Sequence, residues 1–337
     1  MKNADKSAGS MDSTPGHLPS SHPAVFVLPH FNNGTAQELQ SLRGALESIR
    51  NQTDDHWRAI LVDDASPGSE IKSCLSQWSR EFGGRLDVVY SQENCGPGSA
   101  RNLGVQRAHE AGYPYVLFLD ADDLAHPKRV EVTRRLFQEN PEVGVIYSTF
   151  EVIDELGKPV PRERLTPSIL EILEVHETDP PQGDDVWISI ATRTGYINLT
   201  SATAVRTDVA HACPFPCERV SEDFCAWLAY SARGARYLYA PSIPAKYRIP
   251  QGVEGSASRS REGGVRQFNL TKSRVDVLGF ETAISMARER RALSNEQERT
   301  IRRQFFLRRA VSMNKDGERD LAEDFYRRAL HAETAQL

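Results

Sequence analysis

The sequence predicts an α/β protein with a mostly parallel sheet flanked by helices, followed by a helical appendage at the C-terminus. Short apolar runs alternate with segments that repeat apolar residues at helical spacing, which is typical of βαβ units. The apolar runs are nearly continuous, as expected of strands covered on both faces. Polar clusters follow three of them, with the sequences PHFNN, DDAS and DADD. Such clusters gather at the carboxyl edge of a parallel sheet, where ligands bind.

The first half of the chain supplies most of the expected elements. Residues 1–23 are rich in serine, glycine and proline and predict a disordered leader. The first strand is expected at AVFVLP (Ala24–Pro29), where the proline ends it. The later elements are expected in this order: helix 38–52, strand 57–66, helix 70–82, strand 86–92, a helix opening near Ser99, strand 115–120, helix 127–140 and strand 143–153.

The second half is less regular. Five prolines between Leu156 and Ile190 favour loops, as an insertion or a flexible active-site segment. Strands are expected within 195–210 and 237–249, with a helix over 221–234 between them and a mobile Gly/Ser-rich loop over 250–264. We therefore expect one α/β domain over 24–264 and a helical region over 265–337, whose last two helices join at Asp316-Gly317.

Composition narrows the class of protein. The 337 residues are 39% hydrophobic and 26% charged, and the net charge of −5 does not favour nucleic-acid binding. No apolar run of about 18 residues and no secretory signal is present, so we expect a cytoplasmic protein without a membrane segment. The five cysteines are an odd number without a regular framework and suggest reduced thiols. Cys213 and Cys217 could ligate zinc, but no second pair has suitable spacing. The arginine-rich C-terminal helices favour packing on the main domain. An acidic or membrane partner is the alternative, and these helices are also a candidate surface for self-association.

Three carboxylates follow the strand YVLFLD closely, at Asp120, Asp122 and Asp123. Their mutual repulsion raises their pKa values unless a cation offsets it. Oxygen ligands suit Mg2+ or Mn2+, and Mg2+ often takes one or two carboxylates together with phosphate oxygens. The pattern therefore indicates a metal–diphosphate site, with a helix N-cap near Pro127 as the alternative.

The segment NCGPGSARNLG predicts a second binding element. Gly96 and Gly98 permit close approach of the backbone, and the helix that follows would offer free N–H groups to an anion. Arg101, in its first turn, is placed to bond a phosphate. Dinucleotide binding is disfavoured because Arg101 replaces the third glycine of that fingerprint, and an ordinary loop is the remaining alternative.

Two further pairs of adjacent acidic residues each allow a structural and a functional interpretation. Asp63 and Asp64 end a strand and could accept a hydrogen bond from a base such as uracil, while Phe31 could stack on the ring; each is otherwise an ordinary turn or core residue. Glu222 and Asp223 begin a helix, where with the preceding serine they could cap it. The functional alternative is a general base that takes a proton from an attacking hydroxyl.

Taken together, VFVLPHFNN, AILVDDAS, ENCGPGSARNLG, FLDADD and SEDF resemble, in order and spacing, the family 2 glycosyltransferases of the GT-A type, a Rossmann-like fold. The resemblance spans about Ala24 to Ile249. It implies a metal-dependent enzyme, using Mn2+ or Mg2+, that binds a nucleotide-diphosphate sugar, with a UDP-sugar favoured, and inverts the anomeric centre.

The resemblance also implies roles for individual residues. Asp223 would be the catalytic base, with Glu222 beside it shaping the acceptor pocket. Asp120 and Asp122 would form the DxD motif that touches ribose and metal, and Asp123 would share that work. The remaining donor-binding residues it implies are Pro29, Phe31, Asn32, Asp63, Asp64, Gly98, Arg101 and Arg248. Because the sequence shows no membrane segment or interfacial helix after the catalytic domain, we expect a soluble acceptor, which is a small molecule, a saccharide or a peptide.

The sequence departs from the family pattern at two positions. Phe31 stands where the family commonly has a tyrosine, and no histidine follows the Tyr247-Arg248 pair as a further metal ligand. Arg248 could then contact phosphate directly. Two other functions are weighed against transfer: a sugar-nucleotide nucleotidyltransferase, whose Gly/Arg/Lys-rich loop is missing after the first strand, and a non-catalytic sugar-nucleotide-binding scaffold.

Overall fold

A computed structural model describes residues 22–249 and 263–334. Most of the predicted leader and of the predicted mobile loop lies outside the described residues. The strands are β1 (Ala24–His30), β2 (Trp57–Asp63), β3 (Leu86–Tyr90), β4 (Tyr115–Phe118), β5 (Val143–Tyr147), β6 (Phe150–Ile153), β7 (Thr203–Arg206), β8 (Arg236–Tyr239) and β9 (Ala245–Arg248). The α-helices are α1 (Ala36–Arg50), α2 (Ser69–Glu81), α3 (Pro97–Glu110), α4 (Arg129–Glu139), α5 (Pro167–Thr178), α6 (Val186–Ser189), α7 (Thr207–Ala212), α8 (Glu222–Ala232), α10 (Val265–Glu289), α11 (Asn295–Lys315) and α12 (Arg319–Thr334).

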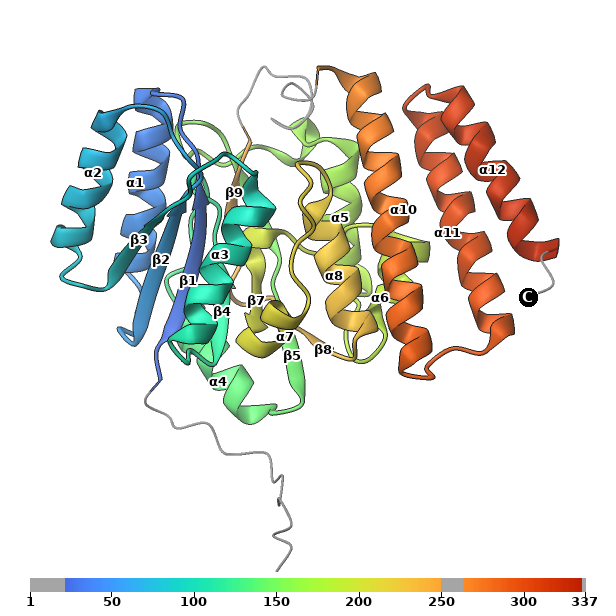
Figure 1. The fold of residues 1–337 in the computed structure, drawn as a ribbon, viewed down its shortest axis with the longest axis horizontal. Coiled ribbons are helices and arrows are strands. Elements are labelled where there is room, and N and C mark those ends of the chain that lie inside the picture. Colours follow the sequence, from blue (N-terminus) through green and yellow to red (C-terminus); the bar gives the residue numbers. More distant parts are fainter. Residues whose placement is uncertain (1–21, 250–262, 335–337) are drawn as a thin grey trace, which may run out of the picture.

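Seven strands form one sheet in the order β3-β2-β1-β4-β7-β5-β8. Every neighbouring pair is parallel except those of β7, which runs antiparallel to both β4 and β5. β1 rises from the bottom to the top of Figure 1, so the carboxyl ends of the parallel strands face the top. This arrangement confirms the predicted mostly parallel α/β fold with helices appended at the C-terminus.

Helices cover both faces of the sheet and bury a core on each. On one face α1, α2 and α4 pack on alternate strand residues such as Phe26 and Leu61. On the other face α3 and α8 cover the intervening residues, such as Val27 and Val62, and the C-terminal helices continue the same core outward. Two buried faces explain why the strands are continuous apolar runs instead of alternating ones.

β1 continues through Pro29, one residue beyond the expected end. β1 pairs with β4 only over Val25–Val27, so the missing N–H of Pro29 removes no bond on that side.

Two segments expected as single strands are each divided between two sheets. The 143–153 segment forms β5 in the large sheet and β6 in a second sheet, where β6 pairs with β9. The 237–249 segment likewise forms β8 and β9. The two segments lie side by side where they leave the large sheet. There, Ser148 Oγ of the first segment donates a hydrogen bond to the Ile243 carbonyl of the second, 2.8 Å away.

The proline-rich segment 156–190, expected as loops, contains the twelve-residue helix α5. Pro167 occupies its first turn, where a missing N–H costs nothing. Ile169 and Ile172 on α5 pack with Phe150 of the small sheet. The prolines therefore bound a helix here.

The C-terminal region consists of three long helices, at the right of Figure 1. α11 begins with a capping box formed by Ser294 and Gln297, and it joins α12 at Asp316-Gly317, as expected. α10 packs directly on α8: a Cβ added at Gly279 would lie 2.5 Å from Cys225 Sγ. Within the described residues, no helix is long and apolar enough to cross a membrane.

Candidate active site

The three aspartates after β4 occupy different environments. Asp123 is buried, and it accepts hydrogen bonds from Ser201 Oγ and from the Arg248 backbone N–H. Burial, followed by repulsion from Asp122 and Asp120, raises the pKa of Asp123 well above its usual range. Asp120 is partly exposed and Asp122 is exposed. The cluster therefore gathers three carboxyl groups at the carboxyl edge of the sheet, one of them buried.

Arg248 and Arg129 hold this cluster from two sides. Arg248 Nε donates to the Asp122 carbonyl at 2.7 Å, and its Nη1 donates to the Asp154 carbonyl at 2.8 Å. Arg129 is buried and donates to the carbonyls of Phe118 and Thr203. Burial lowers the pKa of Arg129 to about 9, although Asp123 and Asp120 oppose the shift. In all of these bonds the arginines donate to backbone carbonyl oxygens.

The helix-capping alternative for this cluster is wrong. α4 begins at Arg129 with Lys128 as its N-cap, and the Val130 N–H in its first turn donates to Gln52 Oε1 at 2.9 Å. Asp122 and Asp123 lie one loop earlier and bond elsewhere.

A divalent cation fits the cluster after β4. The donors are hard carboxylate oxygens, and one of the three residues, Asp122, is exposed. Among the described residues, three ligand atoms come within 4.8 Å of one another only at Asp54, Asp55 and His56, before β2. The aspartates after β4 do not form such a group, so their role as metal ligands stays a prediction.

Arg101 joins the end of β4 to the start of α8. Its Nη2 lies 2.7 Å from Asp120 Oδ1, and its Nη1 lies 2.9 Å from Glu222 Oε1. Burial opposes the charge of the guanidinium, but the two carboxylates more than offset that effect and raise the pKa of Arg101. Both terminal nitrogens thus bond to protein, and the predicted contact of Arg101 with a diphosphate stays a prediction.

Asp223 lies in the first turn of α8, beside Glu222. Its side chain is partly exposed, and its Oδ1 accepts a hydrogen bond from the Phe224 N–H. Burial, and then repulsion from Glu222, raise the pKa of Asp223 to about 7, while Arg101 and Lys272 act against the shift. A carboxylate with this pKa suits general-base catalysis near neutral pH. The predicted serine cap is wrong in detail, because Ser221 occupies the N-cap position without a capping bond.

Asp63 and Asp64 are both buried and bonded to protein. Asp63 accepts hydrogen bonds from His30 Nδ1 at 3.0 Å and from Ser66 Oγ. Asp64 accepts from the backbone N–H groups of Cys95, at 3.0 Å, and Gly96, at 2.7 Å. The pair therefore ties the loop after β2 to the loop before α3, and contact with a base stays a prediction.

The remaining predicted residues line the same edge. Phe31 is 41% exposed beyond β1, which suits a stacking face. Asn32 is buried, and its Oδ1 accepts from the Thr35 N–H, which shapes the turn into α1. A Cβ at Gly98 would lie 3.1 Å from Glu222 Cγ and 3.2 Å from Phe215 Cβ. Close packing of α3 against the loop before α8 is thus one reason for a glycine at position 98.

Several residues of this site were not found by sequence reasoning. Ser201 donates to Asp123 and accepts from the Asp120 N–H at 2.9 Å. Lys272 of α10 donates to Ser221 Oγ at 2.8 Å, and Tyr196 Oη lies 2.9 Å from the same oxygen. These residues come from distant segments, and no local motif marks them.

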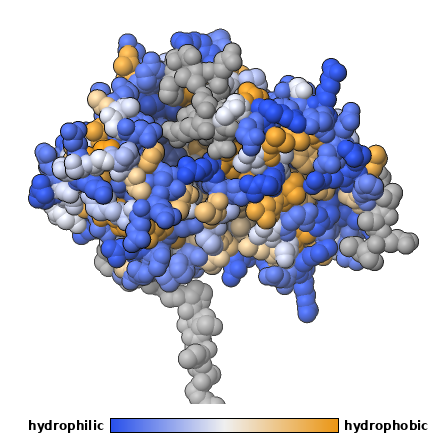
Figure 2. Space-filling view, turned by 45° about the horizontal axis from the view of Figure 1, so that its top comes forward, coloured by the Kyte–Doolittle hydropathy of each residue, from blue (hydrophilic) through white to orange (hydrophobic). Residues whose placement is uncertain are grey.

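The carboxyl edge comes forward in Figure 2, where hydrophilic side chains cover most of the sheet half and hydrophobic side chains gather over the helical half.

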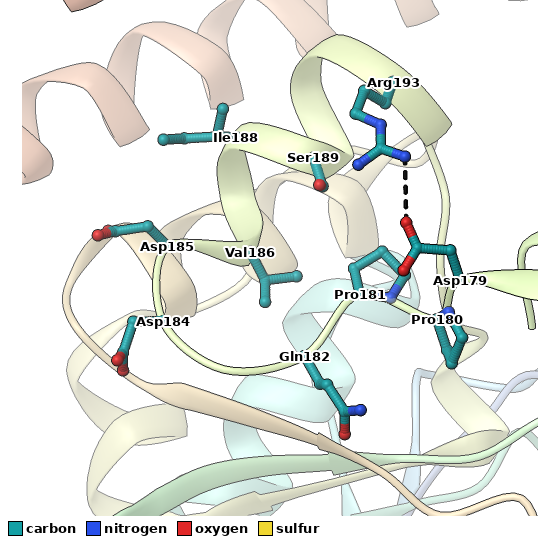
Figure 3. A pocket seen from close by; sticks show the side chains of 10 residues that line it. All are labelled: Asp179, Pro180, Pro181, Gln182, Asp184, Asp185, Val186, Ile188, Ser189 and Arg193. Carbon is teal, nitrogen blue, oxygen red and sulfur yellow. Dashed lines mark hydrogen bonds and ion pairs between the residues drawn. The ribbon is translucent and has the colours of Figure 1, made fainter.

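A separate cavity of about 300 Å³ lies beside β8, lined by residues such as Asp179, Asp184, Val186 and Arg193. Figure 3 shows Arg193 paired with Asp179 at its rim, at 3.2 Å. None of the predicted site residues lines this cavity.

The family model described as "Glycosyl transferase family 2" matches residues 26–199, which is just over half of the chain. The chain belongs to glycosyl transferase family 2. This match confirms the family resemblance and the expectation of a glycosyltransferase.

Curated relatives agree with this family. An uncharacterized glycosyltransferase of Methanocaldococcus jannaschii is 30% identical over 34% of this chain and 39% of its own length. Two Rickettsia relatives are matched over only 17% and 18% of their lengths. The putative teichuronic acid biosynthesis glycosyltransferase TuaG of Bacillus subtilis is 28% identical over 72% of this chain and 86% of its own length.

Solved structures share the fold at low identity. The S. aureus TarS 1–349 structure in complex with UDP-GlcNAc is 15% identical, covers 90% of both chains and has a TM-score of 0.53. The mannosyltransferase PcManGT of Pyrobaculum calidifontis, in complex with GDP-Man and Mn2+, is also 15% identical and has a TM-score of 0.54, covering 94% of this chain and 78% of that one. The GT-A fold is therefore shown for this chain.

Proposed function

We propose that the protein transfers a sugar, with inversion, from a nucleotide-diphosphate sugar to a hydroxyl group of a small molecule, saccharide or peptide. One observation carries the proposal: a single buried guanidinium, Arg101, bonds Asp120 on one side and Glu222 on the other. It sets the distance between the carboxylates after β4 and the first turn of α8. A donor-binding side and a base are thereby held in one rigid frame.

The donor side consists of the residues at the ends of β1, β2 and β4. Phe31 would stack on the base, and Asp64 and Asp63 would lie beside it. Asp122 and Asp120 would hold Mn2+ or Mg2+, and this ion would supply positive charge to the departing diphosphate. The complexes of the neighbours with UDP-GlcNAc and with GDP-Man and Mn2+ support a nucleotide-sugar donor, and a UDP-sugar leads among the candidates.

The acceptor side consists of Asp223 and its surroundings. Asp223 would accept the proton of the acceptor hydroxyl as that oxygen bonds to the anomeric carbon. The bond from that carbon to the diphosphate breaks at the same time, and the diphosphate leaves with the electron pair. Attack from the face opposite the diphosphate inverts the anomeric centre. A base with a pKa of about 7 is partly ionised at neutral pH and is strong enough to take the proton.

Two variants test this division of labour. UDP binding is measured by calorimetry with and without Mn2+, and turnover is followed as release of UDP from UDP-GlcNAc and related donors. Asp122→Ala should lose the Mn2+-dependent part of binding. Asp223→Asn should bind UDP as the wild type does and lose turnover about 10²–10⁴-fold.

Each outcome separates the proposal from its alternatives. Normal Mn2+-dependent binding by Asp122→Ala would contradict the metal assignment, and an active Asp223→Asn would contradict the base. Binding without turnover of any donor by the wild type would favour the non-catalytic scaffold. Formation of a nucleotide sugar from a nucleoside triphosphate and a sugar phosphate would favour the nucleotidyltransferase.

A further inference from the structure

The turn that leads into α8 has an unusual backbone. Ser221, the N-cap residue, adopts a left-handed conformation with φ of 59° and ψ of 18°. A residue with a Cβ reaches this conformation at a cost of about 1–2 kcal/mol, so the surroundings must hold it. Ser221 is buried and directly precedes Glu222 and Asp223. The direction in which Asp223 projects therefore depends on what holds Ser221.

The hydroxyl of Ser221 is held by groups from outside α8. Lys272 Nζ, on α10, donates to it at 2.8 Å, and Tyr196 Oη lies at 2.9 Å. The ammonium group also lies over the Tyr196 and Phe224 rings, 4.8 Å and 5.7 Å from their centroids. The turn before the proposed base is thus held by Lys272 of the C-terminal helix α10 and by Tyr196, which precedes β7.

Lys272 is itself fixed by a buried ionic network. Its Nζ donates to both carboxylate oxygens of Asp276, at 3.2 Å and 3.0 Å, and Asp276 is fully buried. Arg309 of α11 is buried too, and its Nη1 lies 2.8 Å from Asp276 Oδ2. Two cationic side chains thus share one carboxylate, and burial lowers the pKa of Lys272 while Asp276 acts against that shift.

We propose that Lys272 is a positioning residue of the transfer reaction: from the C-terminal helix α10 it fixes the Ser221 turn and adds positive charge near Asp223. This inference rests on the proposed function, because it assigns Asp223 the role of base. It also makes α10 and α11 part of the catalytic apparatus instead of a separate appendage.

Groups from several elements face Asp223 and set its charge. On α8 these are Glu222 and Cys225, and on α3 the group is Arg101. Tyr196, Tyr247 of β9 and Lys272 complete the surroundings. Arg101 and Lys272 are the two cations that act to lower the pKa of Asp223. Without Lys272 this pKa should rise further, so a larger fraction of the enzyme would be protonated at pH 7.

The test compares Lys272→Met with Lys272→Arg, and with Lys315→Met as a control at the exposed end of α11. In Lys272→Met, Asp276 keeps Arg309 as its partner, so we expect the chain to fold. Release of UDP from UDP-GlcNAc with Mn2+ is measured between pH 5 and 9. Lys272→Met should lower kcat at pH 7 about tenfold and move the acid limb of the kcat profile upward by about one pH unit. Lys272→Arg should keep the wild-type limb, and Lys315→Met should match the wild type throughout.

A merely structural role for Lys272 would lower kcat at every pH without moving the limb, and this result would overturn the proposal. Wild-type kcat and limb in Lys272→Met would overturn it as well. Ser221→Ala provides a second variant: it keeps the Lys272–Asp276 pair and should lower kcat several-fold with UDP binding unchanged. Asp223→Asn separates the two proposals. An active Asp223→Asn contradicts the proposed base, whereas an inactive Asp223→Asn with an unmoved limb in Lys272→Met contradicts this inference alone.

Discussion

Two pairs of adjacent acids, Asp63-Asp64 and Glu222-Asp223, lie at the same edge of the sheet and differ in their electrostatic surroundings. Burial raises the pKa of Asp63, but hydrogen bonds from His30 and Ser66 outweigh it, so the pKa is lowered overall. Burial and Glu222 instead raise the pKa of Asp223 to about 7. Identical side chains therefore become a permanent anion in one place and a proton acceptor in the other. Hydrogen-bond donors decide the role of Asp63, whereas burial and a neighbouring acid decide that of Asp223.

Among the variants that test this comparison, Arg101→Met should lower stability most, because it removes the cation shared by Asp120 and Glu222. Two carboxylates would then lose their buried partner, and we expect the free energy of unfolding to fall by about 3–5 kcal/mol. Chemical denaturation measures the loss. Arg107→Met, on the same helix but half exposed and 3.8 Å from Asp87, is the control and should change stability by less than about 1 kcal/mol. Equal effects of the two variants would show that the buried bridge adds no stability.

Asp63→Asn should lower the stability of the protein, because it removes from the Asp63-Asp64 pair the negative charge that His30 and Ser66 stabilise. We expect a loss of about 1–3 kcal/mol in unfolding free energy at pH 7. The folded pKa of Asp63 is lowered, so its stabilisation is present above the unfolded pKa of about 4 and disappears as pH falls through the folded value. Denaturation at pH 7 and at pH 3 therefore should show a difference between wild type and variant that shrinks in acid. A constant difference would contradict the charge-based explanation.

Gly279→Ala tests the packing behind the second pair. The added methyl group would lie 2.5 Å from Cys225 Sγ and would push α10 away from α8. We expect a loss of about 1–2 kcal/mol in stability, together with a fall in kcat because Lys272 moves with α10. Gly44→Ala on α1, where the nearest atom is 3.5 Å away, is the control. Loss of stability without any change in kcat would separate packing from positioning.

Asp223→Asn should show the smallest stability change, and in the opposite direction. A raised folded pKa means that ionising Asp223 costs stability as pH rises from about 4 toward 7. Asparagine carries no charge, so at pH 8 the variant should be more stable than the wild type by on the order of 1 kcal/mol. Thermal unfolding at pH 5 and pH 8 measures the difference, which should grow with pH. If the variant is less stable than the wild type at pH 8, the fold stabilises the charge of Asp223, as it does that of Asp63.

The sequence predicted the fold wherever local pattern and tertiary environment agree. The apolar runs of β1, β2 and β4 and the helical spacing of α1 and α3 identified the parallel core and its carboxyl edge. The division of 143–153 between two sheets was not predictable, because residues on both sides of Ser148 are equally apolar and β-prone. Helix α5 was not predicted, because prolines usually interrupt helices, whereas Pro167 lies in the first turn of this one.

The residues of the candidate site likewise fall into those that the sequence predicts and those that it does not. Residues after strands, such as Asp64 and Asp122, were found because a short motif places them at a known edge. Lys272 and Ser201 were missed, since each reaches the site from a segment without a motif of its own. Lys272 is one lysine in a charged helix, and only the packing of α10 on α8 gives it a role. Arg101 was found by its motif, but its carboxylate partners lie 19 and 121 positions away in sequence.

The antiparallel strand β7 has a consequence for how the chain folds. β7 lies between β4 and β5, so it alone joins β3-β2-β1-β4 to β5 and β8 in the large sheet. A growing chain that has not yet produced Thr203–Arg206 presents β4 as an uncovered edge, ready to pair with another chain. Ser201, which bonds both Asp120 and Asp123, arrives with the same segment. The segment that joins the two parts of the sheet therefore also brings Ser201 to the aspartate cluster, and chains that stop before it leave the β4 edge uncovered and are prone to aggregate.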